Sequence, residues 1–461
     1  MRRLLAPLII LVLIALAAPA HASRTQSLTF EAPRDLMNAE LRPAALEEID
    51  SFGVRSVRVI VTWKTVAPGG GSAQRPDFEP TDPNAYDWGE YEPLMAAIKA
   101  RGWSVLMTIS GPVPVWATKD KLDDKTRPST SAFAAFVTAV GRKFGEQVDT
   151  WAIWNEPNQP QFLRPQYAKG GRAASPGIYR NLYLAGVRGL RKSGQGDDKI
   201  LIAETSPRGN SNVVAPLRFL RGMLCLDNRY RKRSKCRALP ADGYAHHAYT
   251  TRQGPFFRPP QKDDVTIGVL SRLTKALDRA RSARALTKRL PIYLTEFGIQ
   301  STPDLQQGVS LTQQVQYRAI SERIAWNNPR VTAFSQYLLT DSEATGPKQY
   351  AGFESGLRFA NGRAKPSLAG FRLPIAVKRS GSKVSIWGLV RPATGVTSAT
   401  VTYADGRGSF KKLRTVRTNS RGYFTVSSTY RSNRRWNLTW EGQTGAPVAA
   451  YSSSRPRQRR G

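Results

Sequence analysis

Eight short runs of β-branched and apolar residues alternate with longer amphipathic stretches along residues 27–371, and this alternation constrains the fold most. The predicted strands are residues 28–31, 54–63, 104–110, 148–155, 199–206, 243–249, 291–297 and 331–339. The clearest predicted helices are residues 44–51, 91–101, 131–144, 178–192, 265–286 and 312–326. Eight strand–helix units predict an α/β protein with a (β/α)8 barrel. The alternative, an open doubly wound sheet, would be expected to carry a phosphate-binding glycine turn after its first strand, and none is present.

The pattern changes after residue 371. Residues 384–388, 399–403 and 423–427 alternate apolar with polar side chains and are separated by glycine-bearing turns. This alternation predicts a small all-β, immunoglobulin-like sandwich over residues 372–450, following a barrel domain over residues 23–371. The last residues, 451–461, form a basic tail that is expected to be disordered.

Tryptophans in the predicted sandwich have two possible roles. They either stack on sugars at the surface or pack in the core, which is the commoner fate of tryptophan in a sandwich. The residues concerned are Trp387, Trp436 and Trp440.

The first 22 residues predict a cleavable export signal. Arg2 and Arg3 precede an apolar run, and Ala20 and Ala22 form a small-residue cleavage site. The alternative is an uncleaved anchor, but the run is short for a span that needs about 20 residues. No later segment is apolar enough to cross a bilayer, so a secreted protein with no transmembrane segment in its mature chain is expected.

Cys225 and Cys236 are the only two cysteines. In an oxidising compartment, two thiols this close in sequence are expected to form a disulfide. A zinc site is a poor competitor, because two cysteines lack the further ligands that zinc needs.

The formal net charge of +35 favours attraction to an anionic surface or polymer. Export makes an anionic cell-wall polymer a better candidate than nucleic acid, which we do not expect as a partner. The last 90 residues hold 18 Lys and Arg against 2 acidic residues, so the C-terminal domain is the expected point of attachment. A solvated, arginine-rich surface without a specific partner is an equally good explanation.

Two predicted strands end in a glutamate. The sequence WAIWNEPN at residues 151–158 is an apolar run that ends in Asn155 and Glu156, and residues 291–298 end in Glu296 before a glycine. Barrel enzymes place their chemistry at the C-terminal ends of the strands, so both carboxylates are expected at one mouth.

Further polar and aromatic residues stand at other strand ends. His247 and Tyr249 share one face of the sixth strand, because strand side chains alternate. Arg58 and Trp63 lie near the end of the second strand, and Trp116 follows the third. Aromatic faces stack on the apolar faces of pyranose rings, so Trp63 and Trp116 are expected to stack on the substrate. Each has a simpler explanation alone, since a buried histidine, tyrosine or tryptophan is usually a packing residue. Together they indicate glycosidic bond cleavage, which needs one acid to protonate the leaving oxygen and another to meet positive charge at the anomeric carbon.

Several motifs resemble the clan of retaining (β/α)8 glycoside hydrolases that includes the cellulase-like and β-xylosidase-like families, the latter more closely. The motifs are WAIWNEPN at 151–158, LTEFG at 294–298 and D-x-x-x-x-H-x-Y at 242–249. Residues 53–63 and 362–367 are similar to the clan's second strand and closing segment. The resemblance covers residues 29–371 and implies a secreted member of actinobacterial type.

The resemblance also implies roles for individual residues. Glu156 matches the general acid/base, and Glu296 matches the nucleophile. Asn155 matches the amide that holds the substrate 2-hydroxyl. His247, Tyr249 and Arg58 match residues that support the catalytic carboxylates.

One position departs from the clan. Many members end the eighth strand with a substrate-stacking tryptophan, whereas this chain has Tyr337 there, and Tyr337 is the candidate replacement. The expected function is retaining hydrolysis of O-glycosidic bonds in a polysaccharide or oligosaccharide by double displacement, without metal or other cofactor. A transglycosylase acting on an envelope polysaccharide is the first alternative, and a non-catalytic glycan-binding surface protein is the second.

Overall fold

The computed structural model describes residues 26–233, 235–343 and 353–452. The predicted signal, residues 1–22, lies outside them, as does most of the predicted tail. No helix among the described residues is long and apolar enough to cross a membrane.

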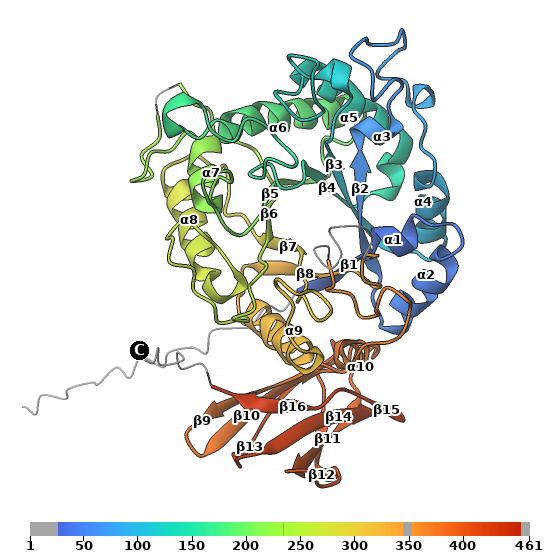
Figure 1. Ribbon diagram of the computed structural model, residues 1–461, viewed down its shortest axis with the longest axis vertical. Helices are drawn as coiled ribbons and strands as arrows, with labels where there is room; N and C mark the ends of the chain where they lie inside the picture. Colours follow the sequence, from blue (N-terminus) through green and yellow to red (C-terminus); the bar gives the residue numbers. More distant parts are fainter. Residues whose placement is uncertain (1–25, 234, 344–352, 453–461) are drawn as a thin grey trace, which may run out of the picture.

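Eight parallel strands close into a barrel in sequence order, and helices surround it (Figure 1). The strands are β1 (Ser27–Glu31), β2 (Ser56–Thr62), β3 (Ser104–Ser110), β4 (Thr150–Ile153), β5 (Lys199–Thr205), β6 (Gly243–His247), β7 (Ile292–Glu296) and β8 (Val331–Tyr337). The helices are α1 (Pro33–Leu36), α2 (Arg42–Ser51), α3 (Trp63–Val66), α4 (Tyr91–Ala100), α5 (Thr130–Phe144), α6 (Ser175–Lys192), α7 (Pro216–Met223), α8 (Ser271–Ser282), α9 (Leu311–Trp326) and α10 (Pro366–Arg372). The predicted barrel is confirmed.

Local sequence explains where the main elements begin. Strands such as β3 are apolar on both faces because the barrel core covers one face and helices cover the other. The Ser129 hydroxyl accepts a hydrogen bond from the N–H of Ala132 and starts α5, and Ser310 with Gln313 forms a capping box at α9. Helix α7 was not predicted, because it is short and begins at a proline.

The barrel is joined least tightly between its first two strands. β1 and β2 pair at one position, Phe30 with Val57, whereas β2 and β3 pair along their whole length. The C-terminal half of β2 therefore lacks a strand partner on the β1 side.

The C-terminal domain is all-β, as predicted, and packs beneath α9 and α10 (Figure 1). Its strands are β9 (Ile375–Ser380), β10 (Lys383–Leu389), β11 (Ser398–Asp405), β12 (Lys411–Arg417), β13 (Tyr423–Thr429), β14 (Arg434–Trp440), β15 (Gln443–Thr444) and β16 (Val448–Tyr451). β16 pairs with both β14 and β9 and joins the two halves of the sheet, which share one apolar core as in a sandwich.

Two of the three tryptophans of this domain pack internally. Trp387 and Trp436 are fully buried, and the indole N–H of Trp440 donates to the Thr397 hydroxyl at 2.9 Å. The packing explanation therefore holds for Trp387 and Trp436. The predicted tail also starts too early, because Tyr451 belongs to β16 and packs against Phe256 of the barrel domain.

The two domains share a buried charged contact. Arg391 of the C-terminal domain bonds the Glu322 carboxylate of α9 at 2.8 Å, and Arg318 of α9 bonds the same carboxylate at 3.2 Å. Trp387 packs beside them on Ala319 and Ile320. The C-terminal domain is thus fixed to the helix that follows β7.

Candidate active site

The chain leaves the β conformation as soon as β4 ends. Trp154 and Glu156 have φ values of +74° and +39°, in the left-handed region that non-glycine residues rarely adopt. Such strained backbone occurs preferentially at functional sites. Glu296, in contrast, is the last residue of β7, and the two carboxylates meet at the C-terminal mouth of the barrel.

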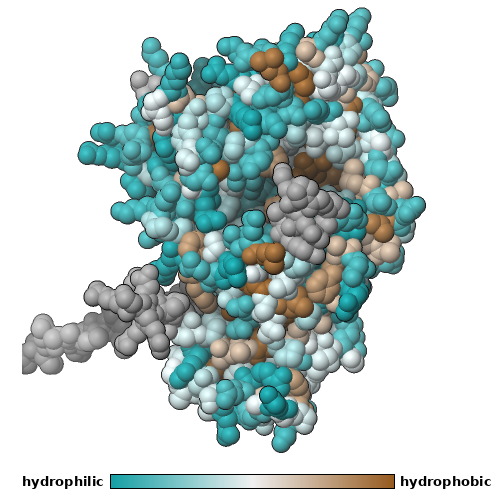
Figure 2. All heavy atoms as spheres, viewed as in Figure 1, coloured by the Kyte–Doolittle hydropathy of each residue, from teal (hydrophilic) through white to brown (hydrophobic). Residues whose placement is uncertain are grey.

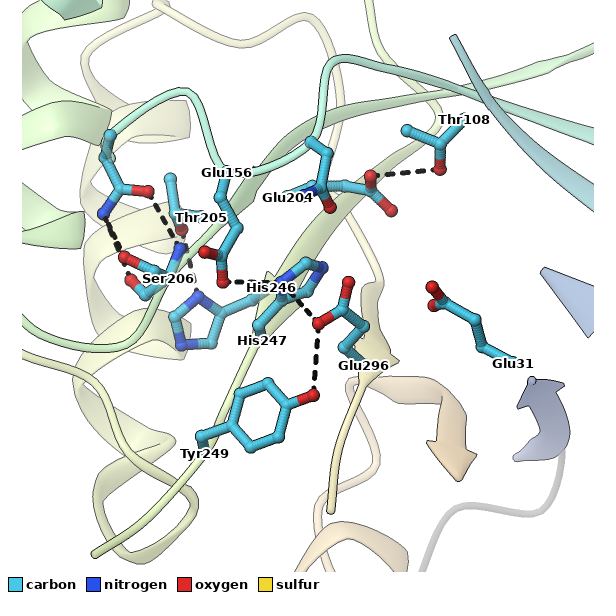
Figure 3. A network of polar contacts seen from close by, with 12 residues as sticks. Glu31, Thr108, Glu156, Glu204, Thr205, Ser206, His246, His247, Tyr249 and Glu296 are labelled. Carbon is cyan, nitrogen blue, oxygen red and sulfur yellow. Dashed lines mark hydrogen bonds and ion pairs between the residues drawn. The ribbon is translucent and has the colours of Figure 1, made fainter. Parts of the chain in front are cut away.

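His247 connects the two carboxylates. Its Nδ1 atom lies 2.8 Å from Oε1 of Glu156 and 3.4 Å from Oε2 of Glu296 (Figure 3). The hydroxyl of Tyr249 donates to Oε2 of Glu296 at 3.1 Å. One carboxylate oxygen of each glutamate and a ring nitrogen of His247 all lie within 4.8 Å of one another. These three side chains could also hold a metal ion, so the sequence-based expectation of a metal-free site stays a prediction.

Arg58 organises the other side of the site. Its Nη1 donates to Glu296 Oε1 at 2.7 Å and also to Glu31. Its Nη2 donates to Asn155 Oδ1 and Glu204 Oε2, both at 2.8 Å, and its Nε donates to the Thr108 hydroxyl at 3.1 Å. All five N–H groups of the guanidinium are therefore used within the protein. Because the oxygen of Asn155 is taken, its NH₂ group is the part that remains available to a ligand.

Glu31 and Glu204 are parts of this network that the sequence reasoning missed. Both are buried and stand at the ends of strands, β1 and β5, so the rule that found Glu156 and Glu296 would have found them. Their strands are among those predicted, but their carboxylates are not among the predicted site residues.

The surroundings give the two central carboxyls different proton affinities. Burial raises the pKa of Glu156 above its ordinary value, and the hydrogen bond from His247 offsets this only in part. Burial acts the same way on Glu296, but the positive charges of His247 and Arg58 outweigh it and lower the pKa of Glu296. The pKa of His247 is raised, because Glu296 and Glu156 outweigh its desolvation. Glu156 is thus the better proton donor and Glu296 the better anion.

A cavity of about 630 Å³ opens over these groups. It is lined by Glu156, Glu296, Asn155 and Tyr249, and its apolar part includes Leu36 of α1 and Leu94 of α4. Figure 2 shows the hollow on this face, with hydrophobic residues inside it. Its volume is in the usual range for small-molecule sites.

The prediction that Trp63 and Trp116 stack on substrate is wrong. β2 ends at Thr62, and Trp63 starts α3, which directs its indole into the core, where it stacks on Phe136 at 5.2 Å between ring centroids. Trp116 is buried edge-on against Trp63, and its N–H donates to the backbone oxygen of Pro68 at 3.1 Å. Neither lines the cavity.

Tyr337 and the two histidines lie in different surroundings. Tyr337, at the end of the eighth strand, lines the cavity beside Tyr249, and its contact with substrate stays a prediction. His246 is a core histidine, held by the Thr205 hydroxyl at 3.0 Å and the Val265 carbonyl at 2.8 Å. His247 is the histidine that faces the carboxylates.

Outside the site, Cys225 and Cys236 form the expected disulfide. The two cysteines are 11 positions apart in the sequence, and the disulfide closes the loop that follows α7.

Fold and site together define a (β/α)8 barrel with two opposed carboxylates at its C-terminal mouth and an all-β second domain. No protein-family model and no curated protein matches the sequence. Solved structures do match the fold. A glucosidase from Croceicoccus marinus matches with a TM-score of 0.55 and 12% identity, covering 91% of this chain and 96% of its own.

Two further matches carry the same architecture. A family 39 glycoside hydrolase from Xanthomonas axonopodis pv. citri has a TM-score of 0.52 and 16% identity over 90% of this chain and 93% of its own. A β-xylosidase from Caulobacter crescentus CB15 has a TM-score of 0.51 and 16% identity over 91% and 96%. The fold implied by the sequence resemblance is therefore confirmed.

Proposed function

We propose that this protein is a retaining glycoside hydrolase. The observation that carries the proposal is the pair of carboxylates, Glu156 and Glu296, which approach within 4.8 Å at the floor of the cavity. Retaining enzymes hold their carboxyl groups about 5–5.5 Å apart, whereas inverting enzymes need about 6.5–9.5 Å to admit a water molecule. The short separation favours double displacement.

In the proposed first step, Glu296 attacks the anomeric carbon while Glu156 gives its proton to the departing glycosidic oxygen. Arg58 and Tyr249 hold the Glu296 carboxylate in place. In the second step, Glu156 takes a proton from water, which attacks the same carbon and releases Glu296. The NH₂ group of Asn155 is positioned to bind the sugar 2-hydroxyl.

The glucosidase and β-xylosidase activities of the structural neighbours support a carbohydrate substrate for this chain. We propose that the substrate is a polysaccharide or an oligosaccharide. Analysis of the products at high acceptor concentration separates hydrolysis from glycosyl transfer, because hydrolysis yields mainly new reducing ends.

The roles of the two glutamates are tested by replacing each with alanine and assaying a panel of aryl glycosides and polysaccharides. Each variant should lose hydrolysis, and added azide should restore cleavage of activated aryl glycosides because it fits the vacated space. With Glu296→Ala the glycosyl azide should have inverted configuration, since azide attacks the substrate directly. With Glu156→Ala it should have retained configuration. Unchanged hydrolysis in the folded Glu296→Ala protein would remove the proposal.

We also propose that the protein is exported and attaches to an anionic cell-wall polymer. The disulfide supports an oxidising compartment. Attachment is supported by the edge strand β12, which exposes a row of basic side chains: Lys411, Lys412, Arg414 and Arg417.

Attachment is tested by charge reversal in the full chain. Lys411→Glu with Lys412→Glu should weaken wall binding, and increasing salt should weaken binding of the unchanged protein. The control is Lys99→Glu with Lys199→Glu, an equal charge change at exposed positions on the barrel. Equal effects of both double variants would show that only net charge matters.

A further inference from the structure

Glu31 is a cavity carboxyl that the proposed mechanism does not use. It is the last residue of β1, is 3% exposed and lies on the cavity wall. In Figure 3 its carboxyl group lies across from that of Glu296. A carboxyl at this depth, so close to a second one, needs an explanation.

The two oxygens of Glu31 differ in their bonding. Oε2 accepts a hydrogen bond from Arg58, while Oε1 accepts none from the described residues. Glu204 also accepts a hydrogen bond from Arg58 and has no part in the proposed mechanism. It is fully buried and does not line the cavity. Glu31 thus has an oxygen available to a ligand, and Glu204 offers a comparison residue that shares its arginine.

Among the described residues that line the cavity, no cation is left for an acidic ligand. The carboxyl groups of Glu31, Glu204 and Glu296 bond the buried Arg58, and that of Glu156 lies near Glu296. Arg58 is the only basic residue among the described residues that line the cavity, and all five of its donors are already used. A substrate carboxylate would meet the ionised Glu296 and find no free cation among the described residues that line the cavity, which disfavours binding.

The wall beside Glu31 is apolar. Leu36 and Met37 of the α1 region and Leu94 of α4 line this part of the cavity, where β1 and β2 are joined at a single pair. Such a wall accepts the carbon faces of a sugar and offers no hydrogen bond to an ionised substituent.

We infer, building on the proposed glycosidase function, that Glu31 binds a hydroxyl group of the sugar in a site that selects neutral glycones over uronic acids. Burial raises the pKa of Glu31 to about 8, so at neutral pH the group is largely protonated and can donate to a sugar oxygen as well as accept from one. The large positive charge of the protein therefore lies outside its catalytic cavity.

The experiment uses the full chain and 4-nitrophenyl glycosides. The β-glucoside is compared with the β-glucuronide, which differs only by the carboxylate at C6. The best neutral substrate is then compared with its monodeoxy analogues, each lacking one hydroxyl. Glu31→Ala removes the group, Glu31→Gln keeps its size, and Glu204→Gln perturbs Arg58 without changing the cavity wall.

We expect Glu31→Ala to lower kcat/KM for the parent sugar by about ten- to a hundredfold, the range for a hydrogen bond in a buried site. For one monodeoxy analogue the loss should be less than about threefold. Glu31→Gln should restore part of the loss for the parent sugar. Glu204→Gln should affect the parent and every analogue that keeps the 2-hydroxyl equally, because Glu204 bonds Arg58 and Thr108 and does not line the cavity. The 2-deoxy analogue is left out of this comparison, since Arg58 also holds Asn155.

Two results would overturn the inference. One is an equal loss in Glu31→Ala for the parent and every analogue. The other is faster turnover of the glucuronide than of the glucoside by the unchanged protein. If either occurs while cleavage still depends on Glu296, the proposed role of Glu31 is refuted and the proposed glycosidase function is not. If no glycoside is cleaved in a Glu296-dependent way, the glycosidase proposal fails and this one with it.

Discussion

Replacing Gly186 by alanine tests how tightly the strand that precedes Glu156 is packed. Gly186 lies in α6, against Ile153, the last residue of β4. An added Cβ would lie 2.8 Å from the Ile153 Cδ1 atom and 3.1 Å from two further Ile153 carbons. Overpacking of this kind costs about 1–3 kcal/mol, while alanine in a helix gains about 1 kcal/mol over glycine.

The same helix provides a matched control. A Cβ at Gly177 would meet no atom within 4 Å, so Gly177→Ala should keep the helical gain without the clash. Urea unfolding followed by tryptophan fluorescence should place Gly186→Ala about 1–3 kcal/mol below Gly177→Ala. Gly186→Ala should also lower kcat, because Ile153 is three residues from Glu156. Equal stabilities of the two variants would refute the close packing of Gly186 against Ile153.

Four further predictions concern pH, metal, the disulfide and the domain contact. The rate should be bell-shaped in pH: it falls as pH drops through the lowered pKa of Glu296, which must be ionised, and as pH rises through the raised pKa of Glu156, which must be protonated. A pH–rate profile whose alkaline limb persists in Glu156→Ala rescued with azide would contradict the assignment. EDTA should leave hydrolysis unchanged; loss of activity that is restored by a divalent cation would instead assign the carboxylates to a metal. Cys225→Ser should lower the free energy of unfolding by about 2–3 kcal/mol, measured by urea unfolding against the oxidised protein. Arg391→Ala should lower it by about 3–5 kcal/mol, because the buried Glu322 loses a partner, whereas a loss below 1 kcal/mol would mean that the contact is solvated.

The periodicity of the sequence was sufficient to predict the barrel. It was also sufficient to predict that four side chains lie close together at its mouth, those of Glu156, Glu296, His247 and Tyr249. Alternation along a strand fixes which side chains share a face, and closure of parallel strands brings their C-terminal ends together. Glu31 was accessible to the same reasoning, but it ends a very short predicted strand, where no long apolar run precedes it.

Other features depend on geometry that a sequence does not carry. The five hydrogen bonds of Arg58 depend on the register of neighbouring strands, which determines which acids lie within reach. Trp63 was misplaced by one residue at the end of β2, and one residue is enough to turn a side chain from the cavity into the core. An aromatic residue near a strand end is therefore a weaker indication of sugar stacking than a strand-end carboxylate is of the candidate active site.

The contact of Arg391 and Trp387 with α9 bears on how such a protein can be rearranged in evolution or engineering. An accessory domain joined by a linker can be exchanged freely, but this one covers the apolar side chains of Ala319 and Ile320 and shares a buried carboxylate with the barrel. A barrel cut at residue 372 would expose that surface and leave Glu322 with Arg318 as its remaining partner among the described residues. We therefore expect the two domains to be inherited as one unit, and recombination between relatives should succeed at loops of the barrel mouth rather than at the domain boundary.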